Sequence, residues 1–234
     1  MAFHISKIAD FGTSEPWVAR LWFGMLKFRD LVYPGNDRLA FDEKYGPVID
    51  NLHECYRAML LLHKTIAEHE AKLVSQEIQN PHFITTENID ITTNEALTSF
   101  FIKGDIAIKH LVRLSKFMGC NISFVRDKED ADFEWQASRI PIQSPFVKQL
   151  VELLRKHRAV WFLRFRDYRD EIEHGPYKKL TVKYVIESDK ARPQFPLIGD
   201  MGLVDGTQKL WQLLFAFVED VLILLFRIEL PRRS

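Results

Sequence analysis

The side chains with the clearest chemical potential are four of the five arginines between Ser144-Pro145, a typical helix start, and Gly175-Pro176, a typical helix end. They are Arg155, Arg158, Arg166 and Arg169. On a helix with about 100° per residue, they fall within one sector about 80° wide. Because a planar guanidinium can bind two phosphate oxygens at once, this sector predicts binding of a phosphate-bearing ligand such as RNA or a nucleotide. The alternative is a solvated basic face whose arginines pair with acids of neighbouring helices.

The same helix ends on the sequence RDEIEHG, residues 169–175, which contains a possible acid-base pair. A His can take the proton from a 2′-hydroxyl of RNA, and an Arg can stabilise the charge that develops on the phosphate. Arg169 and His174 are therefore candidate catalytic residues for RNA cleavage without a metal. On an ideal helix the two positions are about 140° apart. A joint site needs either an unwound last turn at Gly175 or a second subunit that contributes its own pair.

This segment resembles the signature of the HEPN family, which comprises helical nucleotide-binding and ribonuclease domains. In that family an Arg is followed a few residues later by a His near the end of a long helix, and Arg169 and His174 match this pattern. The resemblance implies a metal-independent endoribonuclease without a cofactor, whose composite Arg/His site forms at a homodimer interface. It also implies a toxin or defence component with an antitoxin or another protein as a possible partner.

One position departs from the family pattern, because the Arg is often followed by Asn and here by Asp170. A carboxylate at that position would repel a phosphate unless it supports catalysis by orienting His174. The resemblance therefore leaves an alternative, a catalytically inactive HEPN-like helical module that binds RNA, nucleotide or a protein partner.

A metal site is a rival interpretation of the same helix end. Glu171 and His174 have the spacing with which a di-iron helical bundle places two ligands on one helix, and Asp50 and His53 repeat it weakly. Such bundles also need a Glu from each of two further helices, which the sequence does not identify, so we expect no metal. Walker, dinucleotide-binding and nucleophile-elbow motifs do not occur, which leaves kinase, dehydrogenase and α/β-hydrolase functions without support.

The composition is that of a folded protein with a large apolar core. The chain has 234 residues, of which 47% are hydrophobic, and we expect one domain over residues 1–234. Its 32 basic and 32 acidic side chains give no net charge, which excludes a polycationic nucleic-acid binder. Cys55 and Cys120 are too few for a disulfide framework, and residues 1–7 do not resemble a signal peptide. We therefore expect a cytoplasmic protein.

The most apolar stretch, residues 210–226, is interrupted by Gln212, Glu219 and Asp220. An acid at a helix centre costs about 2.5 to 3.5 kcal/mol of insertion free energy, so we expect a buried helix and no membrane contact.

The periodicity of apolar residues predicts a mainly α protein, an HEPN-like bundle of about five helices with a short β-hairpin between the last two. The first helix is capped by Ser14 and ends at Tyr33-Pro34-Gly35, and the second begins near Pro47 and runs toward Leu73. The third begins at a capping box of Thr92 and Glu95 and ends at Met118-Gly119. The remaining predictions are a loop over 121–143, a helix over 144–175, a strand over 179–187 paired with 194–198, and a last helix over 207–228. On the 144–175 helix, the predicted core face consists of Val147, Leu150, Leu154, Trp161, Phe165, Tyr168 and Ile172.

Overall fold

A computed structural model describes residues 15–74, 86–88, 90–117, 120–121, 130–141, 145–174, 181–187 and 190–233. Its helices are α1 (Pro16–Val32), α2 (Arg38–Val74), α3 (Ile91–Phe117), α4 (Asp130–Ser138), α5 (Pro145–His157), α6 (Leu163–His174) and α7 (Leu203–Arg233), with a π-helical turn (Arg158–Phe162) between α5 and α6 and a 3₁₀ turn (Gly35–Asp37) before α2. The strands are β1 (Thr86–Asn88), β2 (Thr181–Glu187), β3 (Lys190–Gln194), β4 (Leu197–Ile198) and β5 (Met201–Gly202). The prediction of a mainly helical protein with a small antiparallel hairpin before the last helix is confirmed.

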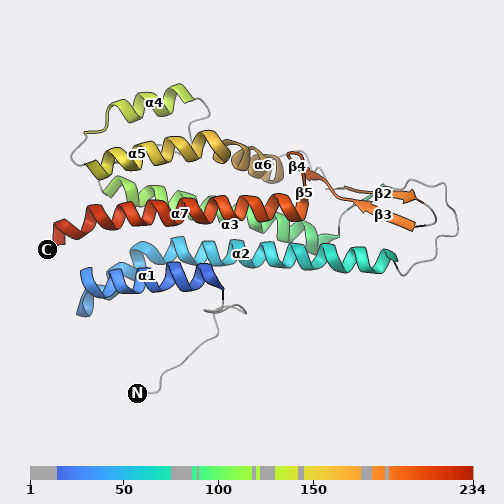
Figure 1. Ribbon diagram of the computed structural model, residues 1–234, viewed down its shortest axis with the longest axis horizontal. Helices are drawn as coiled ribbons and strands as arrows, with labels where there is room; N and C mark the ends of the chain where they lie inside the picture. Colours follow the sequence, from blue (N-terminus) through green and yellow to red (C-terminus); the bar gives the residue numbers. More distant parts are fainter. Residues whose placement is uncertain are drawn as a thin grey trace, which may run out of the picture.

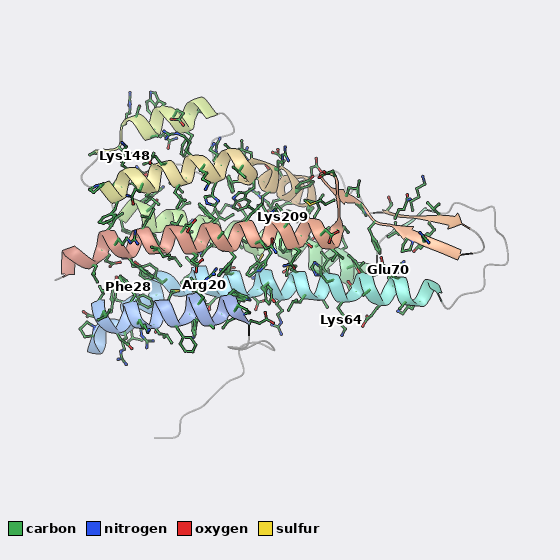
Figure 2. All side chains as sticks on the ribbon, in the orientation of Figure 1. Arg20, Phe28, Lys64, Glu70, Lys148 and Lys209 are labelled. Atoms are coloured by element: carbon green, nitrogen blue, oxygen red, sulfur yellow. The ribbon has the colours of Figure 1, made fainter. Side chains whose placement is uncertain are left out.

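The long helices lie side by side, with α4 outside α5 and the β2–β3 hairpin at one end of the bundle (Figure 1). Helix α7 contacts α1, α2, α3 and α5, and its apolar side chains Leu214, Phe217, Val218, Val221 and Leu225 are fully buried. The ring of Phe28, which is labelled in Figure 2, stacks on the ring of Phe226 of α7 with 3.8 Å between centroids. Burial of this apolar surface is the main stabilising contribution to the fold. No described helix has the length and apolarity needed to cross a membrane.

Helices α3 and α6 approach closely at Gly104. A Cβ atom at this position would lie 2.7 Å from Cζ of Phe165 and 3.2 Å from Cδ2 of Leu214. The absence of a side chain therefore allows the Phe165 ring, which is fully buried, to pack directly against the α3 backbone.

The prediction for the start of the second helix was wrong, because α2 begins at Arg38 and contains Pro47 in its interior. A proline inside a helix removes one backbone hydrogen bond and costs about 3 kcal/mol. Packing outweighs that cost here, since Tyr45, Val48 and Ile49 on either side of Pro47 are all fully buried. The chain turns between α1 and α2 at Gly35, whose φ of 62° favours glycine.

The predicted caps also differ from those in the structure. The N-cap of α1 is Glu15, without a side-chain cap hydrogen bond, and Ser14 lies outside the described residues. Helix α3 is capped by Asp90, whose two carboxylate oxygens accept hydrogen bonds from the Thr93 backbone N–H at 2.9 Å and from the Thr93 hydroxyl at 2.5 Å. Asp90 therefore takes the role predicted for Thr92. The described helix ends at Phe117, and the end predicted at Met118-Gly119 lies outside the described residues.

The strand predicted over 179–187 is confirmed as β2, but its partners differ. It pairs with β3 on one side, with Lys183 opposite Gln194, and with β1 on the other, which the sequence analysis did not predict. Strand β4 instead pairs with β5 across a turn in which Gly199 has a φ of 66°. The predicted partner segment 194–198 is thus divided between two small sheets.

The loop predicted over 121–143 contains helix α4. This helix has nine residues and several acids, so its apolar periodicity is weak in the sequence. It is held by one aromatic side chain, Phe133, which is almost completely buried. The contact that buries Phe133 involves one of the candidate arginines.

Candidate functional site

The predicted helix over 144–175 is one helical run interrupted by the π turn. Its predicted core face is confirmed, because Val147, Leu150, Leu154, Trp161 and Phe165 are buried while Tyr168 and Ile172 are partly buried against the core. A π turn holds more residues than an α turn, and this one begins at Arg158 and ends at Phe162, within the predicted arginine sector. Phe162, which the ideal phase places among the arginines, lies in this turn and is fully buried.

Helix α4 covers the N-terminal half of the arginine sector. Arg155 binds the carboxylate of Glu134 on α4 through two hydrogen bonds, from Nε at 2.5 Å and from Nη2 at 2.7 Å. Arg158 is 1% exposed, and its guanidinium lies 5.6 Å from the ring centroid of Phe133. These two arginines fasten α4 to the helix that carries the candidate site.

The C-terminal half of the sector contains one buried and one partly accessible arginine. Arg166 is 5% exposed, so it also belongs to the interior. The Arg169 side chain keeps 12% of its surface in contact with solvent. The four arginines therefore do not form one solvent-facing edge, and Arg169 is the one that lies in the last turns before His174.

Three carboxylates from two helices surround the Arg169 guanidinium. Its Nη1 lies 2.7 Å from Oε2 of Glu173 and 3.0 Å from Oδ1 of Asp170, both on α6. Its Nε lies 3.6 Å from Oδ2 of Asp105 on α3. Burial lowers the pKa of Arg169, but the Glu173 hydrogen bond and the charges of Asp105 and Asp170 raise it further, so the net shift is upward. Arg169 is firmly cationic.

Asp105 is the residue of this site that sequence reasoning missed. It is 3% exposed, and its Oδ2 also pairs with Nζ of Lys109 at 2.5 Å. One signal in the sequence could have identified it. Asp105 lies one helical turn after Phe101 and one turn before Ile108, so it is an acid within a stripe of otherwise apolar, buried residues. A buried carboxylate on such a stripe needs a cation, and Arg169 with Lys109 meets that need.

The second candidate catalytic residue, His174, is the last residue of α6. The backbone remains α-helical from Arg169 to His174, while the His174 side chain and the predicted unwound turn at Gly175 lie outside the described residues. Asp170, predicted to support catalysis by orienting His174, contacts Arg169.

On another side of α6 there is a hollow of about 560 Å³. It is lined by Arg164, Asp167, Tyr168, Glu171, Gly199 and Asp200. The Gly199 N–H donates a hydrogen bond to the Tyr168 hydroxyl and fastens the β4–β5 turn to α6. Glu171, one of the metal ligands considered from the sequence, thus lies in this mixed-charge hollow.

The rival metal interpretation gains no support from the second spacing. The His53 ring packs edge-on against Trp17 at 5.1 Å and lies 5.9 Å from Trp22. Burial lowers the pKa of His53 despite the nearby Asp50 and Glu54. Within the described part of the chain, no group of three or more His, Cys, Asp and Glu side chains is arranged to hold a metal ion.

Comparison of this chain with models of protein families, with curated proteins and with solved structures gave no match. Function must therefore be argued from the residues and their geometry.

Proposed function

We propose that this chain is an HEPN-like module that cleaves RNA without a metal, with Arg169 and His174 as its catalytic pair. The observation that carries the proposal is the placement of Arg169. It lies five residues before a His at the end of a long helix, and Asp105 of a second helix contacts its guanidinium. A cation held in place in this way is preorganised to stabilise charge on a phosphate.

The reaction needs only these two groups and the RNA. His174 accepts the proton of the 2′-hydroxyl, the 2′-oxygen attacks the adjacent phosphorus, and the bond from phosphorus to the 5′-oxygen breaks. Arg169 stabilises the additional negative charge on the phosphate oxygens. The products are a 2′,3′-cyclic phosphate and, once the leaving oxygen has gained a proton, a 5′-hydroxyl.

The proposed enzyme is a homodimer. Because α6 stays helical through His174, Arg169 and His174 occupy positions about 140° apart on the helix, and a second copy would supply the complementary pair. Sedimentation of the full chain at tens of micromolar tests this part. We expect a dimer, and a strictly monomeric chain would contradict the composite site.

RNA binding should depend on fewer arginines than the four that the sequence suggested. Arg158 and Arg166 are buried, whereas Arg155 is 46% exposed and Arg169 is partly accessible. For single-stranded RNA, the logarithm of the affinity falls linearly with the logarithm of the salt concentration, with a slope of about 0.7 for each phosphate contact. Two contacts give a slope of about 1.4, and four would give about 2.8.

A second candidate function is a helical module that binds RNA or a protein without cleaving. The specific observation in its favour is the set of three carboxylates on Arg169, because they neutralise the cation that a phosphate would need. In this case the purified wild-type protein cleaves no RNA, and the only effect of substituting Arg169 is weaker binding of the RNA or the protein partner.

Two substitutions separate these functions. Arg169→Ala and His174→Ala should each reduce the rate of RNA cleavage by about 10²- to 10⁴-fold. Arg164→Ala is the matched control, since it removes an exposed cation from the same helix and should leave the rate unchanged. Equal rates for His174→Ala and wild type would contradict the proposed catalytic pair.

A further inference from the structure

The Arg169 guanidinium has two sides that differ in accessibility. Its Nε faces Asp105, whose side chain is 5% exposed. Its Nη1 faces Asp170 and Glu173, whose side chains are 31% and 41% exposed. A ligand that arrives from solvent therefore meets the Nη1 side first.

The contact on the inner side is fixed. Asp105 projects from α3, and Lys109 binds the same carboxylate oxygen that faces Arg169. Asp105 Oδ1 and Arg169 Nε are both buried and make no hydrogen bond within the described part of the chain. Withdrawal of the Arg169 side chain would leave Lys109 alone to compensate the Asp105 carboxylate, which is 3% exposed, and a buried carboxylate that loses one of its cations is destabilised.

The contact on the outer side can be exchanged. Arg169 and Glu173 form an (i, i+4) pair on one helix, and such exposed pairs contribute little to stability. A phosphate oxygen offers Nη1 the same charge-assisted hydrogen bond that the Glu173 carboxylate now accepts. The cluster of Asp105, Asp170 and Glu173 with Arg169 and Lys109 also carries one excess negative charge, so an anion binds more readily once Glu173 has moved away.

We propose that Glu173 occupies the phosphate position of Arg169 in the resting protein and is displaced by a phosphodiester of single-stranded RNA, while Asp105 is a positioning residue that keeps the guanidinium in place. This inference rests on the proposed function, because it assumes that Arg169 binds RNA phosphate. It adds that the site is self-inhibited, and that two acids on the same arginine have opposite effects on affinity.

The first test compares two acids of α6. The probe is a single-stranded RNA with 2′-O-methyl groups, which cannot be cleaved by 2′-hydroxyl attack, and binding is measured with the full-length chain. Glu173→Gln should bind this RNA about threefold more tightly than wild type, the change expected for loss of an exposed ion pair. Glu171→Gln removes the same charge from an exposed position two residues away and should bind like wild type.

The second test is a double-mutant cycle. Asp105→Asn should weaken binding about tenfold in the wild-type background and should have no further effect in the Arg169→Gln background. Lys64→Gln removes an exposed cation of α2 outside this cluster and controls for the loss of one charge, so its affinity should equal that of wild type. If Asp105→Asn does not fold, Asp105→Glu replaces it and should retain part of the affinity.

Equal affinities of Glu173→Gln and Glu171→Gln, together with lost binding in Arg169→Gln, would overturn the role of Glu173 and leave the proposed function standing. An equal effect of Asp105→Asn with and without Arg169 would overturn its positioning role. If Arg169→Gln binds RNA as wild type does, both the inference and the proposed function are wrong.

Discussion

The guanidinium of Arg158 lies over the ring of Phe133, 5.6 Å from its centroid, and both side chains are 1% exposed. This contact explains why a helix with little apolar periodicity of its own, α4, has a defined position on the bundle. It also explains why an arginine that the helical phase assigns to a basic surface belongs to the interior.

The first prediction concerns this contact. Phe133→Ala should lower the free energy of unfolding by about 3 to 5 kcal/mol, because it removes a buried ring and uncovers a buried cation. Trp135→Ala is the control on the same helix, since Trp135 is 57% exposed and its ring contacts the Arg139 guanidinium, which lies 3.7 Å from the ring centroid. Urea denaturation should show a loss below about 1 kcal/mol for the control. Equal losses for the two variants would contradict the assigned anchor.

The second prediction uses two helical glycines. Gly104→Ala should destabilise the protein by about 1 to 3 kcal/mol, since the added methyl group meets Phe165 and Leu214. Gly24→Ala on α1 should instead stabilise the protein by about 0.5 to 1 kcal/mol. No neighbouring side chain or other segment lies within 4 Å of the added methyl group, and alanine favours the helix more than glycine does. Thermal unfolding should therefore shift in opposite directions for the same chemical change. A stabilised Gly104→Ala variant would contradict the close packing of α3 and α6.

A third prediction follows from a buried carboxylate where α1, α2 and α7 meet. Glu229 is 4% exposed and accepts hydrogen bonds from the hydroxyls of Tyr33 and Tyr45 and from Nζ of Lys44 at 2.9 and 3.1 Å. Burial raises the pKa of Glu229, but these hydrogen bonds and the Lys44 charge lower it further, so the net shift is downward from the ordinary 4.5.

Because the pKa of Glu229 is lower in the folded protein, its contribution to stability is complete above pH 4.5 and is lost as the pH falls through the folded value. Glu229→Gln should lower the free energy of unfolding by about 2 kcal/mol at pH 7 and by progressively less below pH 4.5. Glu68→Gln, an exposed acid of α2, should change it by less than about 0.5 kcal/mol at either pH. A difference between Glu229→Gln and wild type that grows toward low pH would contradict the direction of the shift.

Apolar periodicity was sufficient to predict the long helices and the core face of α5 and α6, because burial of a continuous stripe decides whether a long segment is helical. It could not predict the start of α2, where local preference at Pro47 opposes the tertiary packing of Tyr45 and Val48. It could not predict α4 either, because that helix has one strongly buried aromatic side chain, Phe133, and is otherwise held by the pairing of Glu134 with Arg155 of another helix.

The candidate site was predictable in its residue types but not in their environment. Ideal helical phase grouped the four arginines. It could not include the π turn within this helix or the contact of Arg158 with Phe133 of α4, because neither is visible in the sequence. The contact between Asp105 and Arg169 joins residues on separate helices, and a single sequence contains no signal that pairs them. Long-range partners of this kind depend on how the helices pack.

Cleavage of single-stranded RNA by the purified full-length chain in EDTA, with chemical identification of the new ends, tests the proposed metal-independent ribonuclease most directly. We expect fragments that end in 2′,3′-cyclic phosphate and begin with 5′-hydroxyl, and we expect His174→Ala to produce none above background. Loss of activity on chelation, fragments with 3′-hydroxyl and 5′-phosphate ends, or no cleavage by the wild-type protein would contradict it.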